Sequence, residues 1–297
     1  MRRILTLCLL WPTLALAKQT SFERVETAKR WSFDVGWRDD AGRYEVHYAV
    51  DRDLIDGDRA ELTFLPRRQL NQHAVAAIEA YGATQRNVTV TASIERGGVR
   101  IGVSGPPDAA RAALAEAEAV RDRSIDAWLA DNRFFRMASG SLSFDHARLV
   151  GDYAPGLTPV AAALTEGVGK RRQAISQVLS FVQSIPYEKR TRKGDDPGYR
   201  RPLALLFRNR GDCDSKAVLF LGLLRADNPK LPMAMVYIPG HALVGLGITP
   251  RPGDTTLEHD GQTYVLAEPV GPAEHALGVI DDASRKGLKR AEVYAVP

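Results

Sequence analysis

Apolar and polar residues alternate along two stretches in the first half of the chain, and this spacing predicts two β-hairpins, each with one buried face. In the first hairpin, the strands Trp31–Trp37 and Tyr44–Val50 flank a turn at Asp39–Gly42. The second hairpin covers Val88–Val103, and its turn Glu95–Gly98 contains two glycines that can take positive φ angles without strain. The first half of the chain therefore contains antiparallel β-structure.

Helical spacing fills the gaps between and after these hairpins. We expect one helix over Gln69–Tyr81, which Gly82 ends, and another over Asp108–Asn132, which Asp108 caps after two prolines. Residues 18–156 are therefore predicted to form a small α+β domain, and no chemical motif in it indicates a role.

The second half of the chain begins with helical periodicity. Val160–Ser184 is predicted to be a long helix, broken or strained near Gly167 and Gly169. Its apolar stripe consists of Ile175, Val178, Leu179 and Val182. After Pro186 come a polar loop over Glu188–Arg201, a short apolar turn over Pro202–Phe207 and a further helix over Gly211–Arg225.

Three predicted strands follow, at Met233–Ile238, His241–Ile248 and Thr263–Glu268. If the third strand lies antiparallel beside the second, its last residue is a neighbour of the first residue of the second, so that Glu268 meets His241. A strand at Thr255–Glu258 with a turn at Asp260–Gly261 would, in a simple meander, make the third strand parallel to the second. The contact between the two side chains therefore requires residues 249–262 to act as one long excursion.

The N-terminus has the pattern of a secretory signal peptide: two arginines, an apolar run over Ile4–Leu16, and small residues at Ala15 and Ala17. We expect residues 1–17 to be removed after Ala17 and the mature protein to be periplasmic or secreted. The run is interrupted by Pro12, and no later segment approaches the roughly 18 apolar residues that a membrane span needs, so no span is expected in the mature form.

Removal of this segment changes the net charge and the thiol content. The formal net charge of +4 falls to +2 without Arg2 and Arg3, so the charge gives no indication of a nucleic-acid partner. Of the two cysteines, Cys213 alone remains, which excludes an internal disulfide.

Cys213 lies in the first turn of the helix predicted over Gly211–Arg225. Unpaired backbone N–H groups at a helix start favour the thiolate, as does Lys216, whereas Asp212 and Asp214 oppose it. Both acids also suit the first turn of a helix because they complement the helix dipole. Two interpretations stay open: Cys213 is a nucleophile, or it is a small apolar residue under a helix cap.

His241 and Glu268 are candidates for the partners of such a nucleophile. A carboxylate beside the imidazole would fix the orientation of the ring and stabilise its charged form, as thiol catalysis requires. The alternative is that His241 has a structural role.

Polar segments elsewhere admit functional interpretations. The loop Glu188–Arg201 carries six Lys/Arg against three Asp/Glu, and it either recruits an anionic substrate or forms a solvated face. The cations that would recruit the substrate are Arg190, Arg192, Lys193 and Arg200. The acidic segment Asp51–Asp58 is predicted to be a solvated turn, because Ile55 stands where a calcium loop needs an oxygen ligand. Asp145 and His146 are expected to have a surface or capping role.

The order of these residues resembles that of a known family. Gly211-Asp212-Cys213 opens a helix, Gly240-His241-Ala242 opens a strand 28 residues after the cysteine, and Glu268 closes a strand 27 residues further on. This order is similar to that of the transglutaminase-like superfamily, particularly its bacterial exported cysteine-peptidase-like members. The likeness covers about Leu157–Pro297.

The resemblance implies a catalytic domain over residues 157–297 with a papain-related core, in which the cysteine helix packs on an antiparallel sheet. It also implies that the Cys213 thiolate attacks an amide, that His241 moves the proton, and that Glu268 orients His241. Gln183 is a candidate oxyanion donor, and a helix-end hydrogen bond is the alternative role for its amide.

Two residues depart from the family's pattern. Most relatives carry Asp where this chain has Glu268, and many, including the cross-linking ones, carry an aromatic residue where it has Leu243. The second departure, together with the lack of an evident calcium site, argues against protein cross-linking.

The sequence therefore predicts an exported cysteine hydrolase or acyltransferase, a peptidase or amidase that acts on a protein or peptide substrate through a thioester, with no cofactor and no metal. Two alternatives stay open: a catalytically silent binding or scaffolding protein with the same core, and a protein-cross-linking transglutaminase.

Overall fold

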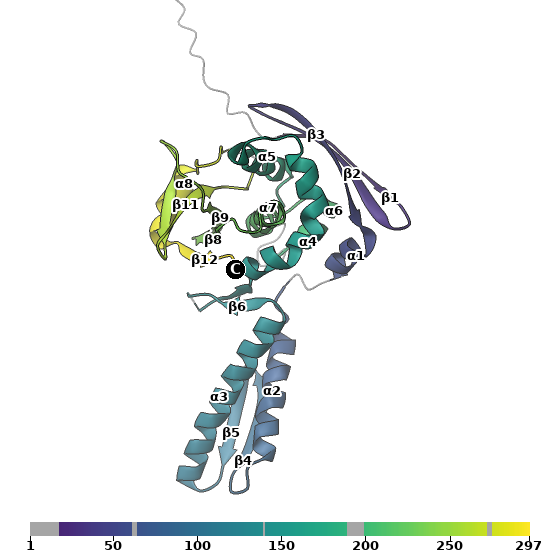
Figure 1. Cartoon of the computed structure of the whole chain (residues 1–297). Coiled ribbons are helices and arrows are strands. Elements are labelled where there is room, and N and C mark those ends of the chain that lie inside the picture. The colour runs from purple at the N-terminus through teal and green to yellow at the C-terminus, as the bar shows by residue number, and fades with distance from the viewer. Residues whose placement is uncertain (1–17, 61–63, 139, 189–198, 272–274) are drawn as a thin grey trace, which may run out of the picture. The chain divides into compact units, whose positions relative to one another are not determined.

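The computed structural model describes residues 18–60, 64–138, 140–188, 199–271 and 275–297 (Figure 1). These residues form two compact units that are interleaved along the chain. The first unit takes its described residues from Met1–Glu61, Val150–Asp195 and Arg200–Pro297, and the second takes them from Leu62–Leu149 and Asp196–Tyr199. This division differs from the expected domains 18–156 and 157–297, because the first three strands pack with the second half of the chain. The predicted signal peptide, residues 1–17, lies outside the described residues.

The second unit contains the hairpin of β4 (Thr89–Glu95) and β5 (Gly98–Ser104), with α2 (Arg67–Ala83) and α3 (Pro107–Asp131) packed against it. Its apolar core contains Ile78, Val90, Ala113 and Ala117. Two short strands, β6 (Phe134–Arg136) and β7 (Leu142–Phe144), form a further hairpin. The predicted hairpin and both predicted helices are therefore confirmed as elements.

Three local details of this unit differ from the prediction. Helix α2 continues through Gly82 to Ala83, so Gly82 does not end it. The β4–β5 turn places positive φ angles at Arg96 (50°) and Gly97 (80°), whereas the prediction placed them at the two glycines. Gly98 is the first residue of β5. The N-cap of α3 is Pro106, so Asp108 lies inside the first turn, where its charge complements the helix dipole without capping it.

In the first unit, β1 (Lys18–Glu26), β2 (Arg30–Asp39) and β3 (Gly42–Asp51) form an antiparallel sheet in that order. The predicted hairpin with one buried face is confirmed, and that face contains Phe33, Val35, Trp37, Val46, Tyr48 and Val50. The first strand was not predicted, because its residues are mostly exposed and polar and carry no alternating apolar signal. The acidic segment after β3 forms helix α1 (Arg52–Ala60) and is not a turn.

This sheet shares its core with helices from the second half of the chain. The indole Nε1 of Trp37 donates a hydrogen bond of 3.1 Å to the Ser180 hydroxyl, and the Phe181 ring meets Trp37 edge-on at 5.3 Å. Arg24 of β1 places its guanidinium 4.1 Å from the ring centroid of Phe207. The first three strands therefore belong to the same compact unit as the predicted cysteine helix.

Between β7 and the second sheet, the described residues form the helices α4 (His146–Thr165), α5 (Arg171–Ser184), α6 (Pro202–Arg208) and α7 (Cys213–Asp227). The predicted break near Gly167 is confirmed, because Gly167 has a φ of 73° between α4 and α5. The first helix begins earlier than predicted and contains Pro155 and Pro159. The predicted stripe Ile175, Val178, Leu179 and Val182 is buried.

The second sheet has five antiparallel strands in the order β10-β11-β9-β8-β12. Three of them match predicted strands: β8 (Met233–Ile238), β9 (His241–Leu246) and β11 (Gln262–Ala267). The intervening strand β10 (Thr256–His259) does form and turns into β11 at Asp260 and Gly261. It lies outside β11, however, so β11 pairs directly and antiparallel with β9.

The chain ends with α8 (Asp282–Gly287), a 3₁₀ turn (Leu288–Arg290) and β12 (Glu292–Ala295), which pairs with β8. The fold is α+β with antiparallel sheets, as predicted. Within the described part of the chain, no helix combines the length and apolarity needed to cross a membrane.

Candidate active site around Cys213 and His241

The cysteine helix α7 begins with a side-chain cap. Asp212 is the N-cap residue, and its Oδ1 accepts a hydrogen bond of 3.1 Å from the backbone N–H of Ser215. Cys213 is the first residue of the helix and is partly buried. The predicted position of the cysteine at a helix start is therefore confirmed.

The surroundings of the Cys213 sulfur favour the thiol over the thiolate. Burial is the largest cause that raises the pKa of Cys213 well above its ordinary range, followed by the charges of Asp214 and Asp212. The thiol donates to Asp214 Oδ1 at 3.4 Å, which also favours the protonated form. A hydrogen bond from the backbone N–H of Ala242 to the sulfur acts in the opposite direction.

His241 and Glu268 form a hydrogen-bonded pair. His241 Nε2 lies 2.7 Å from Glu268 Oε1, and the side chains are 22% and 8% exposed. Ala267 pairs with Val244, so continuing the register by one residue places Glu268 opposite Leu243, diagonal to His241 on the same face. The longer Glu side chain suits this diagonal reach.

The Glu268 carboxylate has two further donors besides His241. Its Oε2 accepts from the backbone N–H of Asp281 at 2.9 Å, and its Oε1 accepts from the Ser284 hydroxyl at 3.1 Å. Burial raises the pKa of Glu268, but the hydrogen bonds from His241 and from the Asp281 N–H outweigh it, so the pKa lies below its ordinary value. Sequence inspection missed Asp281 and Ser284, and the only signal would have been a helix start shortly after the acid.

Cys213 and His241 lie on neighbouring elements. Helix α7 packs on β9, and the Cys213 sulfur accepts from the N–H of Ala242, the residue that follows His241. The structure therefore brings the cysteine to the start of β9 and the acid to the histidine. Leu243, where many members of the similar family carry an aromatic residue, is fully buried in an apolar cluster with Val236 and Leu266.

The Gln183 amide, the candidate oxyanion donor, is directed at two backbone carbonyls. Its Nε2 donates to the carbonyl of Glu268 at 3.0 Å and to that of His275 at 2.9 Å. An amide nitrogen has two hydrogens, so these two bonds use both of them. In this arrangement Gln183 holds the segment that carries Glu268, and the oxyanion role stays a prediction.

Most of the predicted basic loop lies outside the described residues, including Arg190, Arg192 and Lys193. Arg200 is described, and its guanidinium forms a two-pronged ion pair with Glu188, at 2.9 and 2.5 Å. Its charge is therefore neutralised by a neighbour in the same segment. Recruitment of an anionic substrate by this loop stays a prediction.

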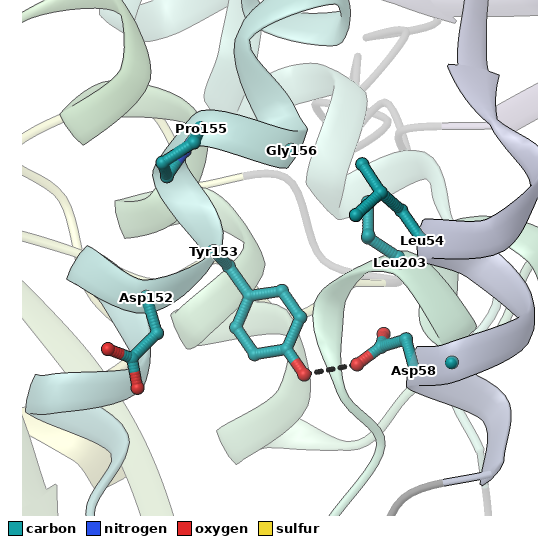
Figure 2. A pocket seen from close by; sticks show the side chains of 8 residues that line it. Leu54, Asp58, Asp152, Tyr153, Pro155, Gly156 and Leu203 are labelled. Atoms are coloured by element: carbon teal, nitrogen blue, oxygen red, sulfur yellow. Dashed lines mark hydrogen bonds between the residues drawn. The ribbon is translucent and has the colours of Figure 1, made fainter.

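The acidic segment Asp51–Asp58 ends in a buried carboxylate (Figure 2). Asp58 of α1 accepts from the Tyr153 hydroxyl of α4 and, at 2.7 Å, from the backbone N–H of Ala204, so it caps helix α6. Burial raises the pKa of Asp58, against the effect of these hydrogen bonds. The pair lines a pocket of about 350 Å³ together with Leu54 and Leu203. The expected solvated position of Asp58 is therefore wrong.

The predicted capping role of Asp145 is supported by a hydrogen bond. Its Oδ1 accepts from the backbone N–H of Arg148 at 3.1 Å at the start of α4. His146 is 2% exposed and packs against the rings of Phe144 and Tyr199. His146 is therefore part of the core of the second unit, and the surface or capping role predicted for it is wrong, whereas Asp145 is only partly buried.

No set of three or more His, Cys, Asp or Glu side chains within the described ranges is arranged to hold a metal ion.

Comparisons with protein-family models, with curated proteins and with solved structures found no match. The geometry around Cys213, His241 and Glu268 is therefore what indicates a function for this protein.

Proposed function

We propose that this protein is an exported cysteine hydrolase of the transglutaminase-like type, a peptidase or amidase with a Cys213–His241–Glu268 triad on a papain-related core. The observation that carries the proposal is the 2.7 Å bond between His241 and a buried carboxylate, on a strand start that also contacts the cysteine through Ala242. A histidine oriented by an acid beside a thiol is the arrangement of nucleophilic thiol catalysis.

The reaction follows from the ring nitrogens of His241. The Nε2–H group of His241 donates a hydrogen bond to Glu268, because an ionised carboxylate can only accept one. Nδ1 is then the nitrogen that removes the Cys213 proton. The sulfur attacks the amide carbonyl, and the C–N bond breaks as the imidazolium returns the proton to the leaving amine. Water then hydrolyses the thioester, with His241 as general base.

The raised pKa of Cys213 favours a second candidate function, a silent binding or scaffolding protein that retains the core. In such a protein the buried thiol and the adjacent Asp214 would keep the sulfur protonated at neutral pH. The two candidates differ in one measurable property, the dependence of thiol reactivity on His241.

The test uses the chain with Cys8→Ser, in which Cys213 is the sole thiol. The rate of iodoacetamide alkylation is measured from pH 5 to pH 9 for this chain, for His241→Ala, and for His259→Ala as a matched control on the β10–β11 hairpin. A catalytic pair predicts fast alkylation at neutral pH that His241→Ala removes and His259→Ala retains. Equal rates in all three would sink the enzyme proposal and favour the silent protein.

Turnover of a panel of peptide amides is the second measurement. Cys213→Ala should abolish turnover, and His241→Ala should reduce it by about 10²-fold or more, the typical contribution of general acid–base catalysis. A labelled primary amine in the assay separates hydrolysis from cross-linking, because a cross-linking transglutaminase would incorporate it.

Export is tested by N-terminal sequencing of the protein isolated from its natural host. The sequence of the mature protein should begin at Lys18.

A further inference from the structure

Lys216 is a fully buried lysine that the proposed chemistry does not use. It lies one helical turn after Cys213 in α7, its side chain is among the largest with no exposed surface, and burial lowers its pKa to about 7. Its Nζ donates to the carbonyls of Ile185 at 2.7 Å and Gln183 at 3.2 Å. These are carbonyls at the C-terminal end of α5, where backbone acceptors lack partners within the helix.

The residue at the end of this contact continues the connection towards the acid. Gln183, whose carbonyl accepts from Lys216, directs its own side-chain amide at the carbonyls of Glu268 and His275. Gln183 therefore connects the cysteine helix to Glu268: its backbone carbonyl accepts from Lys216, and its side-chain amide donates to the backbone carbonyl of Glu268. The carboxylate of Glu268 in turn accepts from His241. These three hydrogen bonds are called the series below.

A close backbone approach at Gly271 indicates that this connection has little slack. A Cβ atom at Gly271 would lie 2.4 Å from the carbonyl oxygen of Gln183, the same oxygen that accepts from Lys216. Such a distance is far below van der Waals contact, and the opposing atom is backbone. The segment after Glu268 therefore passes the end of α5 at a distance that only glycine permits.

We infer that Lys216 is a positioning residue that, through Gln183, fixes the segment carrying Glu268 and thereby the orientation of His241 relative to the cysteine helix. This inference rests on the proposed function for its relevance to catalysis, but the geometry it concerns is that of the His241–Glu268 pair itself. A lysine that only capped α5 would stabilise the fold without affecting the histidine.

The test reads the histidine ring directly. In long-range ¹H–¹⁵N correlation spectra, the ring nitrogen shifts report which nitrogen of His241 carries the proton, and that nitrogen is set by the hydrogen bond to Glu268. The signal is assigned by its loss in His241→Ala. Spectra are compared for the wild-type chain, Lys216→Met, Gln183→Met and the control Ser180→Ala. The control also removes a buried hydrogen bond from α5, but one directed at Trp37 and away from the series.

The inference predicts an Nε2-protonated ring in the wild type and in Ser180→Ala, and averaged nitrogen shifts in both Lys216→Met and Gln183→Met. If the ring keeps its Nε2-protonated signature in both methionine variants, or loses it equally in Ser180→Ala, the positioning role is overturned. Should Lys216→Met fail to fold, retention of the Nε2-protonated signature in Gln183→Met still overturns the positioning role, because the contact from Lys216 reaches Glu268 through the Gln183 side chain.

Alkylation of Cys213 in the same variants separates this inference from the proposed function. If alkylation does not depend on His241 while the ring signature depends on Lys216, the positioning role stands and the enzyme proposal fails. If alkylation depends on His241 but the ring signature is insensitive to Lys216, the enzyme proposal stands and the positioning role fails.

Discussion

The buried ammonium of Lys216 makes the stability of this protein depend on pH in a calculable way. Burial lowers the pKa of Lys216 from 10.5 to about 7, which corresponds to about 5 kcal/mol because each pKa unit is worth about 1.4 kcal/mol. Between these two pH values the unfolded chain binds the lysine proton and the folded chain does not. The contribution to the free energy of unfolding therefore rises with pH through this window, is fully present above pH 10.5, and is lost as the pH falls to 7.

The assay is urea unfolding, followed by circular dichroism, of the wild-type chain and of Lys216→Met between pH 6 and pH 9.5. The difference in unfolding free energy between the two should be constant below pH 7 and should then change by about 3 kcal/mol, in favour of the wild type, up to pH 9.5. The two carbonyls left without a donor in the variant add a cost that does not depend on pH, and the titration of other groups cancels in the difference.

Lys230→Met is the matched control, because Lys230 is exposed and lies just after the same helix. Its difference from the wild type should not change over this pH range. A pH-independent difference for Lys216→Met as well would refute the reasoning, since it would mean that the lysine keeps its proton in the folded protein.

Three further predictions concern residues around the site. Glu268→Gln should lower the free energy of unfolding at neutral pH and make it less dependent on pH in the acidic range. The lowered pKa of Glu268 supplies stability at pH values above the ordinary pKa of a glutamate, and this stability is lost as the pH falls through the lowered pKa. An acid-unfolding curve, followed by circular dichroism, identical to that of the wild type would contradict this. Gly271→Ala should cost about 1–3 kcal/mol in urea unfolding through its clash with the Gln183 carbonyl. The control Gly151→Ala meets no atom within 4 Å inside a helix and should be neutral or stabilising by up to about 1 kcal/mol. Asp58→Ala should lower the unfolding free energy by about 1–3 kcal/mol, because it leaves its buried donors without an acceptor, and a cost near zero would show that the cap of α6 is dispensable.

The elements around the candidate site could be predicted because their signals are local. The helix start at Cys213 follows from an Asp cap before an apolar run, and the strands at Met233 and His241 follow from unbroken apolar stretches bounded by a Pro-Gly turn. The sequence predicts the approach of Glu268 to His241 only on the condition that residues 249–262 leave the two outer strands paired. Both a meander and an excursion are compatible with the same strand pattern, and pairing order depends on tertiary contacts.

The features that the sequence could not predict depend on contacts between segments that are distant in the chain. The strand Lys18–Glu26 carries no apolar alternation from which it could be predicted. Its position is set by pairing with β2. The burial of Asp58 depends on Ala204, which lies 146 residues later in the chain. The path from Lys216 through Gln183 to Glu268 uses backbone carbonyls, which leave no trace in residue identity.

The interleaving of the first unit has a consequence for synthesis in the cell. The apolar face of the first sheet includes Trp37, whose partner Ser180 lies 143 residues further along the chain. At about 5–20 residues per second, a ribosome needs roughly 7 to 30 seconds to make that partner. During this interval the sheet's apolar face is uncovered while the inserted second unit has time to fold. The emerging chain should therefore be a client for chaperones that bind apolar strands, and truncation before α5 should yield an aggregating fragment.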